Sequence, residues 1–276
     1  MKRIFIAYAN EALTYSLKRI GRQARQLGIF DEVILWTPQD LPDDVLHCEL
    51  MQHSYGGGYW VWKPIIIRET LRKYGDDAVV CYVDAGCTLK KGVEWVLYFE
   101  LMSDCDFLCF KYRDTMPCWE KYGSASTKIK HWTKRQAAEF YDELVGNADW
   151  RENNKIWGGV IFAKGKHNPI VEEWCNIVLR HPEIIMHTGY EKNQYPYFAQ
   201  HKHDQPLLVA LTTKYTSRCV VLPELSETCG ENVAIYASRV RARRRVDYIV
   251  WQLKKSVHAV IGDGLYKRLK HLLIRE

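Results

Sequence analysis

One apolar run limits the folds open to this chain more than any other stretch. Residues 78–83 read AVVCYV, and Asp84, Ala85 and Gly86 follow at once. A continuous run of β-branched and aromatic residues predicts a strand buried on both faces, as in the centre of an α/β sheet. An acid followed by small residues at the end of such a strand is typical of the edge where these sheets bind ligands. A cap on the next turn is the alternative explanation of Asp84.

The flanking pattern supports an α/β fold. Residues 4–8 and 32–36 read as strands joined by an amphipathic helix over 13–27, which Gly28 ends. This β-α-β opening favours a parallel sheet. Further strands are expected at 106–110, 155–163 and 220–222, and further helices at 65–74, 93–102, 134–145 and 170–180, with one that begins near residue 204. We therefore expect a mixed, mostly parallel central sheet flanked by helices.

Charge divides the chain into a body, residues 1–238, and a tail, residues 239–276. The tail holds 11 Lys or Arg against 3 Asp or Glu, whereas the body holds 28 against 30. A nearly neutral body argues against nucleic acid as a partner. Apolar residues recur at helical spacing in the tail, which is typical of a helix lying on an anionic membrane surface. A helix that packs on the body or on a partner would show the same stripe.

Cysteine usage and hydropathy bear on location. The 9 cysteines include no close C-x-x-C pair, no secretory signal precedes them, and no window holds 18 consecutive apolar residues. We expect a cytoplasmic protein, peripheral at most on the inner face of the membrane. Cys105 and Cys109 lie in or beside an apolar run and are expected to be core thiols.

Two further stretches hold residue types suited to ligand binding. Residues 55–64 read YGGGYWVWKP, which combines glycines that allow close approach with rings that offer flat faces to a base or sugar. An aromatic cluster that only fills the core is equally compatible. Residues 201–206 read HKHDQP, so that an imidazole, a carboxylate and an amide lie together at the start of a helix. An N-cap explains Asp204 as well.

The order of these motifs resembles that of nucleotide-sugar glycosyltransferases of the GT-A fold, above all bacterial and large-virus enzymes that build capsule, lipopolysaccharide or glycoprotein glycans. The resemblance covers roughly residues 1–225. It rests on the segments GYWVWKP (58–64), YVDAGC (82–87), WTKR (132–135), WGG (157–159) and HDQ (203–205). It implies a hexosyl- or deoxyhexosyltransferase that moves a sugar from a UDP- or GDP-sugar to a glycan, lipid-linked or surface-polysaccharide acceptor.

The resemblance also assigns roles to residues. Asp204 would bind sugar hydroxyls or act as a base, and Gln205 would lie near the anomeric carbon. The donor would contact Tyr8, Ala9, Tyr59, Trp60, Trp62, Lys63, Asp84, Ala85, Gly86, Lys134, Arg135, Trp157, Gly158 and Gly159. Apart from the resemblance, residues 116–132 are irregular and rich in Ser, Lys and Trp, which predicts a mobile active-site loop. A leaving diphosphate also needs positive charge, which Arg239 or Arg241 would supply together with Lys63.

A divalent metal, Mn²⁺ or Mg²⁺, is implied as well, but the chain departs from the family pattern. Such enzymes hold the metal with Asp-x-Asp, whereas this sequence reads Asp84-Ala85-Gly86. A hard cation prefers several oxygen ligands, so His203, His201 or water would have to complete a site on Asp84.

Two other functions stay open. One, which the missing second carboxylate keeps open, is a non-catalytic protein that binds a nucleotide sugar or glycan on the same fold. The other is a sugar nucleotidyltransferase, because a strand followed by an acid also suits a nucleoside triphosphate; the usual glycine-rich activation loop near the amino terminus is absent, which counts against it.

Overall fold

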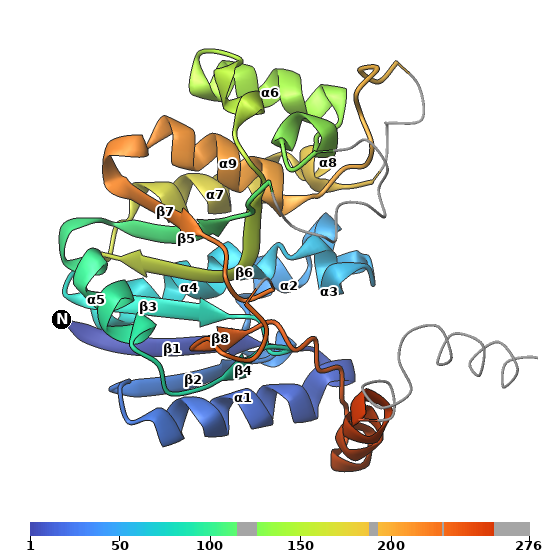
Figure 1. Cartoon of the computed structure of the whole chain (residues 1–276). Coiled ribbons are helices and arrows are strands. Elements are labelled where there is room, and N and C mark those ends of the chain that lie inside the picture. Colours follow the sequence, from blue (N-terminus) through green and yellow to red (C-terminus); the bar gives the residue numbers. More distant parts are fainter. Residues whose placement is uncertain (115–125, 188–192, 228, 257–276) are drawn as a thin grey trace, which may run out of the picture.

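A six-stranded sheet forms the centre of the molecule, with strand order β2-β1-β3-β6-β5-β7 (Figure 1). The structure is a computed structural model, and it describes residues 1–114, 126–187, 193–227 and 229–256. The strands of the sheet are β1 (Lys2–Tyr8), β2 (Glu32–Trp36), β3 (Ala78–Val83), β5 (Phe107–Lys111), β6 (Ile156–Lys164) and β7 (Cys219–Pro223). Two short strands, β4 (Thr88–Leu89) and β8 (Ile235–Tyr236), pair beside it.

The sheet is mixed and mostly parallel, as expected. The pairs β1–β2, β1–β3 and β5–β7 are parallel, whereas β6 runs antiparallel to both of its neighbours, β3 and β5. The amino end of β6 therefore lies beside the carboxyl end of β3. This reversal brings Gly158 and Gly159 to the edge where Asp84 leaves β3.

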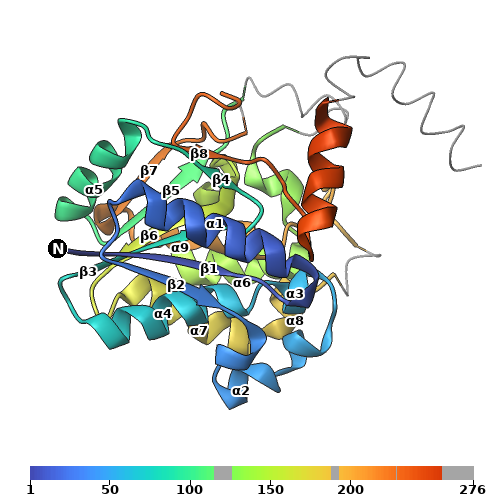
Figure 2. The ribbon, with the colours of Figure 1, turned by 90° about the horizontal axis from the view of Figure 1, so that it is seen from below.

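Helices cover both faces of the sheet. The helices α4 (Trp62–Tyr74), α7 (Pro169–Arg180) and α9 (Asp204–Lys214) lie on one face, and α1 (Thr14–Leu27) and α5 (Glu94–Asp104) on the other (Figures 1 and 2). The remaining helices are α2 (Asp43–Leu46), α3 (Gly56–Tyr59), α6 (Arg135–Val145) and α8 (Pro182–Ile185). All six residues of β3 are buried, which agrees with its expected central place. Cys105 and Cys109 are buried as well.

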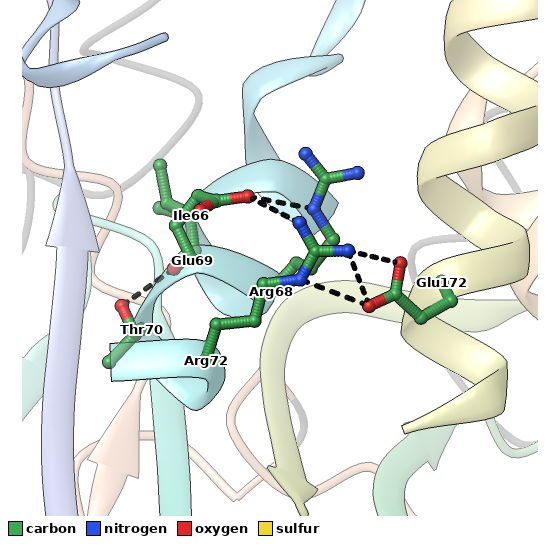
Figure 3. Close-up of polar contacts among 6 residues, drawn as sticks. All are labelled: Ile66, Arg68, Glu69, Thr70, Arg72 and Glu172. Atoms are coloured by element: carbon green, nitrogen blue, oxygen red, sulfur yellow. Dashed lines mark hydrogen bonds and ion pairs between the residues drawn. The ribbon is translucent and has the colours of Figure 1, made fainter. Parts of the chain in front are cut away.

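Helix α4 begins three residues earlier than expected, at Trp62. Pro64 therefore lies inside its first turn, where a backbone without an N–H loses no helical hydrogen bond. At the other end of α4, Arg72 donates to both carboxylate oxygens of Glu172 on α7, at 2.8 and 2.9 Å (Figure 3). This bidentate ion pair links the carboxyl-terminal part of α4 to α7.

The first residues of the tail pack on the body. Val240 and Ala242 are buried, and the Val240 N–H donates to the carbonyl of Gly86 at 2.9 Å. A helix over residues 245–256 follows, and its Val246, Ile249, Val250 and Leu253 are exposed. In the part of the chain that the structure describes, no helix is long and apolar enough to cross a membrane. The division of the chain after residue 238 stays a prediction.

Candidate active site

Asp84 leaves β3 in a fixed position. Its N–H donates to the carbonyl of Gly159 at 2.9 Å, which continues the pairing of β3 with β6 by one residue. The Tyr82 hydroxyl donates to the Asp84 carboxylate, since residues two apart in a strand point to the same side. Burial, together with the neighbouring Asp84 carboxylate, raises the pKa of the Tyr82 phenol well above its usual value. Tyr82 therefore remains a proton donor to Asp84 at physiological pH.

Lys63 and Asp204 form a buried ion pair. The Lys63 Nζ lies 2.7 Å from Asp204 Oδ2 and donates to the carbonyl of Gly158 at 3.0 Å. The same ammonium lies over the Tyr82 ring, 5.5 Å from its centroid. The chain of contacts from Asp84 through Tyr82 and Lys63 thus reaches Asp204. Sequence analysis expected Lys63 to meet the donor; the structure gives its ammonium these partners within the protein.

The pair lies close to the backbone of Gly158. A Cβ at Gly158 would lie 3.2 Å from Lys63 Nζ and 3.3 Å from Asp204 Oδ2. The pairing of β5 with β6 shifts register near this point, as it does at a β-bulge. A Cβ at Gly159 would instead lie 2.6 Å from the Trp157 ring. The WGG motif therefore lets an ion pair and an indole approach the strand backbone, and Trp157 itself is buried.

Tyr8 and Trp62 stack at the end of β1, with ring centroids 4.0 Å apart. The Tyr8 hydroxyl is buried and has no hydrogen-bond partner among the described residues. Burial raises the pKa of Tyr8 to about 12, so the phenol stays protonated. Ala9, which follows, is buried. The predicted contact of Tyr8, Ala9 and Trp62 with the donor is neither confirmed nor contradicted by these positions.

Tyr59 and Trp60 lie elsewhere, against His203. Both have a left-handed backbone, with φ of 49° and 60°. Their ring centroids lie 5.4 Å from that of His203. Tyr59 and Trp60 were expected, like Tyr8, to contact the donor, and their rings lie around the imidazole that precedes Asp204.

His203 is buried, and its Nδ1 is 2.9 Å from the carbonyl of Ile185. Because a carbonyl only accepts, Nδ1 carries the proton and Nε2 keeps a lone pair; Nε2 is buried without a partner among the described residues. Burial lowers the pKa of His203 to about 4, so the ring is neutral at physiological pH. His201, also buried, is held at both ring nitrogens by the backbone of Lys134 and Ile184.

Ala85 and Gly86, which follow Asp84, contact other parts of the chain. Ala85 is buried, and its carbonyl accepts from Arg19 at 3.4 Å. The carbonyl of Gly86 accepts from the Ser238 hydroxyl at 2.9 Å as well as from Val240. Arg239 pairs with Glu227. The segment after residue 237 therefore lies over this part of the edge.

Lys134 and Arg135 contact other parts of the chain. Lys134 is fully buried, and its ammonium donates to the carbonyls of Glu183 and Met186. The Arg135 guanidinium lies over the Tyr195 ring, 4.6 Å from its centroid. Their expected contact with the donor stays a prediction. The expected loop over residues 116–132 lies mostly outside the described residues. Its end, Ile129–Trp132, forms a 3₁₀ turn in which Ile129 and Trp132 are buried.

Among the residues that the structure describes, no metal site built from protein side chains alone is found. The described residues contain no group of three or more His, Cys, Asp or Glu side chains placed to hold a metal ion. Mg²⁺ in phosphate sites is commonly bound by one or two carboxylates plus substrate oxygens, and Asp84, which is half-buried, suits such a site. His203, the other expected ligand, lies instead among aromatic rings.

Comparisons with known proteins leave the family open. No protein-family model matches the chain, and no curated protein matches it. Similar solved structures include a glycosyltransferase involved in glycosylation of the major capsid of PBCV-1, at 10% identity, with 92% of this chain and 100% of that chain covered and a TM-score of 0.48. Mouse xyloside xylosyltransferase 1 is similar at 10% identity, 80% and 85% coverage and a TM-score of 0.39. The galactosyltransferase LgtC, in complex with donor and acceptor sugar analogues, is similar at 13% identity, 79% and 72% coverage and a TM-score of 0.37.

The predicted resemblance to glycosyltransferases is thus found again among solved structures. It concerns the fold, and with every one of these TM-scores below 0.5 it assigns neither an activity nor a residue role to this chain.

Two site residues escaped the sequence analysis. Tyr82 holds Asp84 and carries the Lys63 ammonium over its ring, and strand alternation two residues before Asp84 was the available signal. His187, whose ring centroid lies 4.3 Å from that of His203, comes from a polar stretch without periodicity, so no signal marked it.

Proposed function

We propose that the protein is a glycosyltransferase that moves a hexosyl or deoxyhexosyl group from a UDP- or GDP-sugar to a glycan, lipid-linked or surface-polysaccharide acceptor. One observation carries the proposal: Asp84 and Asp204, 120 positions apart in the sequence, are linked at the carboxyl edge of β3 through Tyr82 and Lys63. Crevices at this edge of α/β sheets are where ligands bind.

The nucleotide would lie at the end of β1. There Tyr8 and Trp62 offer stacked rings, and the partnerless Tyr8 hydroxyl offers a hydrogen bond. The diphosphate would follow beside Asp84. Mn²⁺ or Mg²⁺ held by Asp84 and phosphate oxygens would supply positive charge where negative charge develops on the leaving diphosphate.

The transferred sugar would lie beside Asp204. Lys63 occupies Oδ2, while Oδ1 has no hydrogen-bond partner among the described residues and remains able to accept from a sugar hydroxyl. The Gln205 Oε1 is buried without a partner there as well. Two acceptors next to each other on α9 would orient a polyhydroxylated ring, and Lys63 would hold the Asp204 carboxylate in place as a positioning residue.

Binding and turnover of nucleotide sugars test the proposal. Thermal shift and donor hydrolysis would be measured against UDP- and GDP-sugars, UDP and GDP, each with and without Mn²⁺. We expect stabilisation by one nucleoside diphosphate and its sugar conjugates, and slow hydrolysis of one conjugate. The proposal fails if none of these ligands binds under either condition.

Two readouts, one from this experiment and one from an added incubation with a nucleoside triphosphate and a sugar phosphate, separate the alternatives. Tight binding of a nucleotide sugar without hydrolysis or transfer would favour a non-catalytic binding protein, for which the single carboxylate at Asp84 argues. Release of pyrophosphate from a nucleoside triphosphate and a sugar phosphate would favour a nucleotidyltransferase.

The helix over residues 245–256 supports a proposal on location: a cytoplasmic protein that binds the inner face of a membrane. Exposed Val246, Ile249, Val250 and Leu253 share this helix and its flank with basic residues, Arg243, Arg244, Arg245, Lys254 and Lys255. Binding to anionic vesicles should weaken with salt and fall after Ile249→Ser and Leu253→Ser. Equal pelleting of this double variant and the parent chain would remove the idea.

A further inference from the structure

Five aromatic and imidazole rings lie together, those of Tyr55, Tyr59, Trp60, His187 and His203, here called the His203 ring cluster. The four other ring centroids lie between 4.3 and 5.4 Å from that of His203. The His201 ring also lies 5.4 Å from that of His203, but backbone groups occupy both of its nitrogens, so it is not counted in the cluster. Three of the side chains come from residues 55–60, and a fourth is that of His187; both places are separated from residue 203 in the sequence. The cluster lies next to Asp204, because His203 directly precedes Asp204 in the sequence.

The cluster contains strained backbone. The described part of the chain has five residues other than glycine with positive φ, and three of them, Tyr59, Trp60 and His203, belong to this cluster. His203 has φ 53° and ψ −108°, a region that L-residues rarely adopt. Such strain costs roughly 1–3 kcal/mol per residue and gathers where a function requires a particular side-chain position.

The cluster also contains an unmet hydrogen-bond acceptor. His203 is 3% exposed, its Nδ1 is bound to the Ile185 carbonyl, and its Nε2 lone pair has no partner among the described residues. Gln205 Oε1, two residues along, is buried and partnerless there too. Ten buried side-chain polar atoms of the described residues lack a hydrogen-bond partner, and these two acceptors are the pair that flanks Asp204, where the hydroxyl groups of a ligand would supply the missing donors.

We propose that the His203 ring cluster is a pyranose subsite in which Nε2 of His203 accepts a hydrogen bond from a sugar hydroxyl while the neighbouring rings pack against the apolar face of the sugar. Tyr55, which is 45% exposed, is the most exposed side chain of the cluster. A neutral imidazole accepts such a bond, and the low pKa of His203 keeps it neutral. This inference rests on the proposed function and adds to it the group that selects the sugar. The sugar would be either the transferred group of the donor or the terminal residue of the acceptor.

The test measures how much the sugar adds to nucleotide binding. Calorimetry would compare the nucleoside diphosphate and the nucleotide sugar identified by the screen, on the parent chain and on His203→Phe and His203→Gln. Phe keeps a ring and removes the acceptor, whereas the Gln amide oxygen lies about where Nε2 lies and restores one. His201→Phe is the matched control, because both nitrogens of His201 already have backbone partners.

For the donor arm we expect His203→Phe to bind the nucleoside diphosphate as the parent does and to lose about tenfold in affinity for the nucleotide sugar, with partial recovery in His203→Gln. A deoxy analogue that lacks the recognised hydroxyl should bind parent and His203→Phe equally. For the acceptor arm, methyl pyranosides would be tested as acceptors with saturating donor, and the same loss should appear in KM with kcat little changed. His201→Phe should lower the melting temperature and leave sugar affinity unchanged.

Loss in either arm supports the subsite and identifies its occupant. Unchanged affinity for the nucleotide sugar together with unchanged KM for every accepted pyranoside overturns it, even if the enzyme transfers sugar. The proposed function fails separately, through absent nucleotide binding in the parent chain. Trp60→Ala, which removes a packing ring without touching the acceptor, is the second variant should His203→Phe not fold.

Discussion

The two acids at the edge of the sheet are held in opposite ways. Asp84 is half-buried and accepts from a neutral phenol, that of Tyr82, and no cation is among its hydrogen-bond or ion-pair partners in the described residues. Asp204 is buried and bound to the ammonium of Lys63. The charge of Asp84 therefore stays available to a cation from outside, whereas that of Asp204 is already balanced within the fold.

This difference suggests that the two acids bind different ligand groups. An unbalanced carboxylate suits a divalent ion that arrives with a diphosphate. A balanced carboxylate is a poor metal ligand and a good acceptor for neutral hydroxyl groups, because its negative charge costs little to keep buried beside Lys63. The two acids would thus contact different parts of one donor, and the following predictions test that division.

The largest expected effect is on turnover. Asp204→Asn and Asp84→Asn should each lower kcat by about 10³-fold, through lost sugar orientation and lost charge stabilisation respectively. Only Asp84→Asn should change the Mn²⁺ concentration that gives half-maximal rate. Equal metal dependence in both variants would show that the two acids do not divide the donor between them.

The next largest difference between the two acids should be in their contributions to the free energy of unfolding. Asp204→Ala leaves the Lys63 ammonium buried without its partner and should lower the free energy of unfolding by about 3–5 kcal/mol, whereas Asp84→Asn should cost less than about 1 kcal/mol. The double variant Lys63→Met, Asp204→Asn should recover most of the loss but no activity. Urea denaturation measures all three. A stable Asp204→Ala protein would mean that the ion pair forms only weakly.

Lowering the pH should lower the free energy of unfolding through the buried histidines that precede Asp204. The pKa of His203 is lowered from 6.5 to about 4 by burial, and burial also lowers that of His201. Between pH 6.5 and 4 the unfolded chain binds protons that the folded chain refuses, so the free energy of unfolding falls as pH falls, by on the order of 3 kcal/mol for His203. His203→Gln should flatten this slope in urea denaturation measured across this pH range. If the free energy of unfolding of His203→Gln depended on pH as that of the parent chain does, the lowered pKa of His203 would be contradicted.

The smallest effect tests the close approach at Gly158. Gly158→Ala places a methyl group against both members of the ion pair and should cost about 1–2 kcal/mol of stability and about tenfold in turnover. Gly21→Ala, whose Cβ would meet the Leu35 side chain between α1 and β2, is the control. It should lower stability similarly and leave turnover unchanged. A fully active Gly158→Ala enzyme would show that the pair tolerates displacement.

Much of the fold followed from the sequence because its signals are local. The buried run of β3, the β-α-β opening and the glycine after α1 are periodicity and capping patterns, and each element formed near its expected bounds. The joint position of residues 58–63, 84, 158 and 204 was anticipated through the family resemblance. The partner of Lys63 was not, because an ion pair 141 residues apart in the sequence leaves no local trace.

The rings illustrate the same limit. Composition marked Tyr59, Trp60 and Trp62 together, yet left-handed backbone at Tyr59 and Trp60 sends their rings to His203, while Trp62 begins a helix and stacks on Tyr8. Adjacent residues thus serve different ends of the site. A change of handedness over a few residues is set by packing, and propensity does not reveal it.

Ser16 has a consequence for how the protein can be shortened. Its hydroxyl donates to the Val240 carbonyl at 3.0 Å and accepts the Ala242 N–H at 3.0 Å, and its own N–H donates to the Ala242 carbonyl at 3.1 Å. A polar side chain with no exposed surface near the amino terminus thus relies on residues close to the other end of the chain. Versions cut before residue 240 would leave that hydroxyl without these partners, so any shortened form should retain Val240 and Ala242.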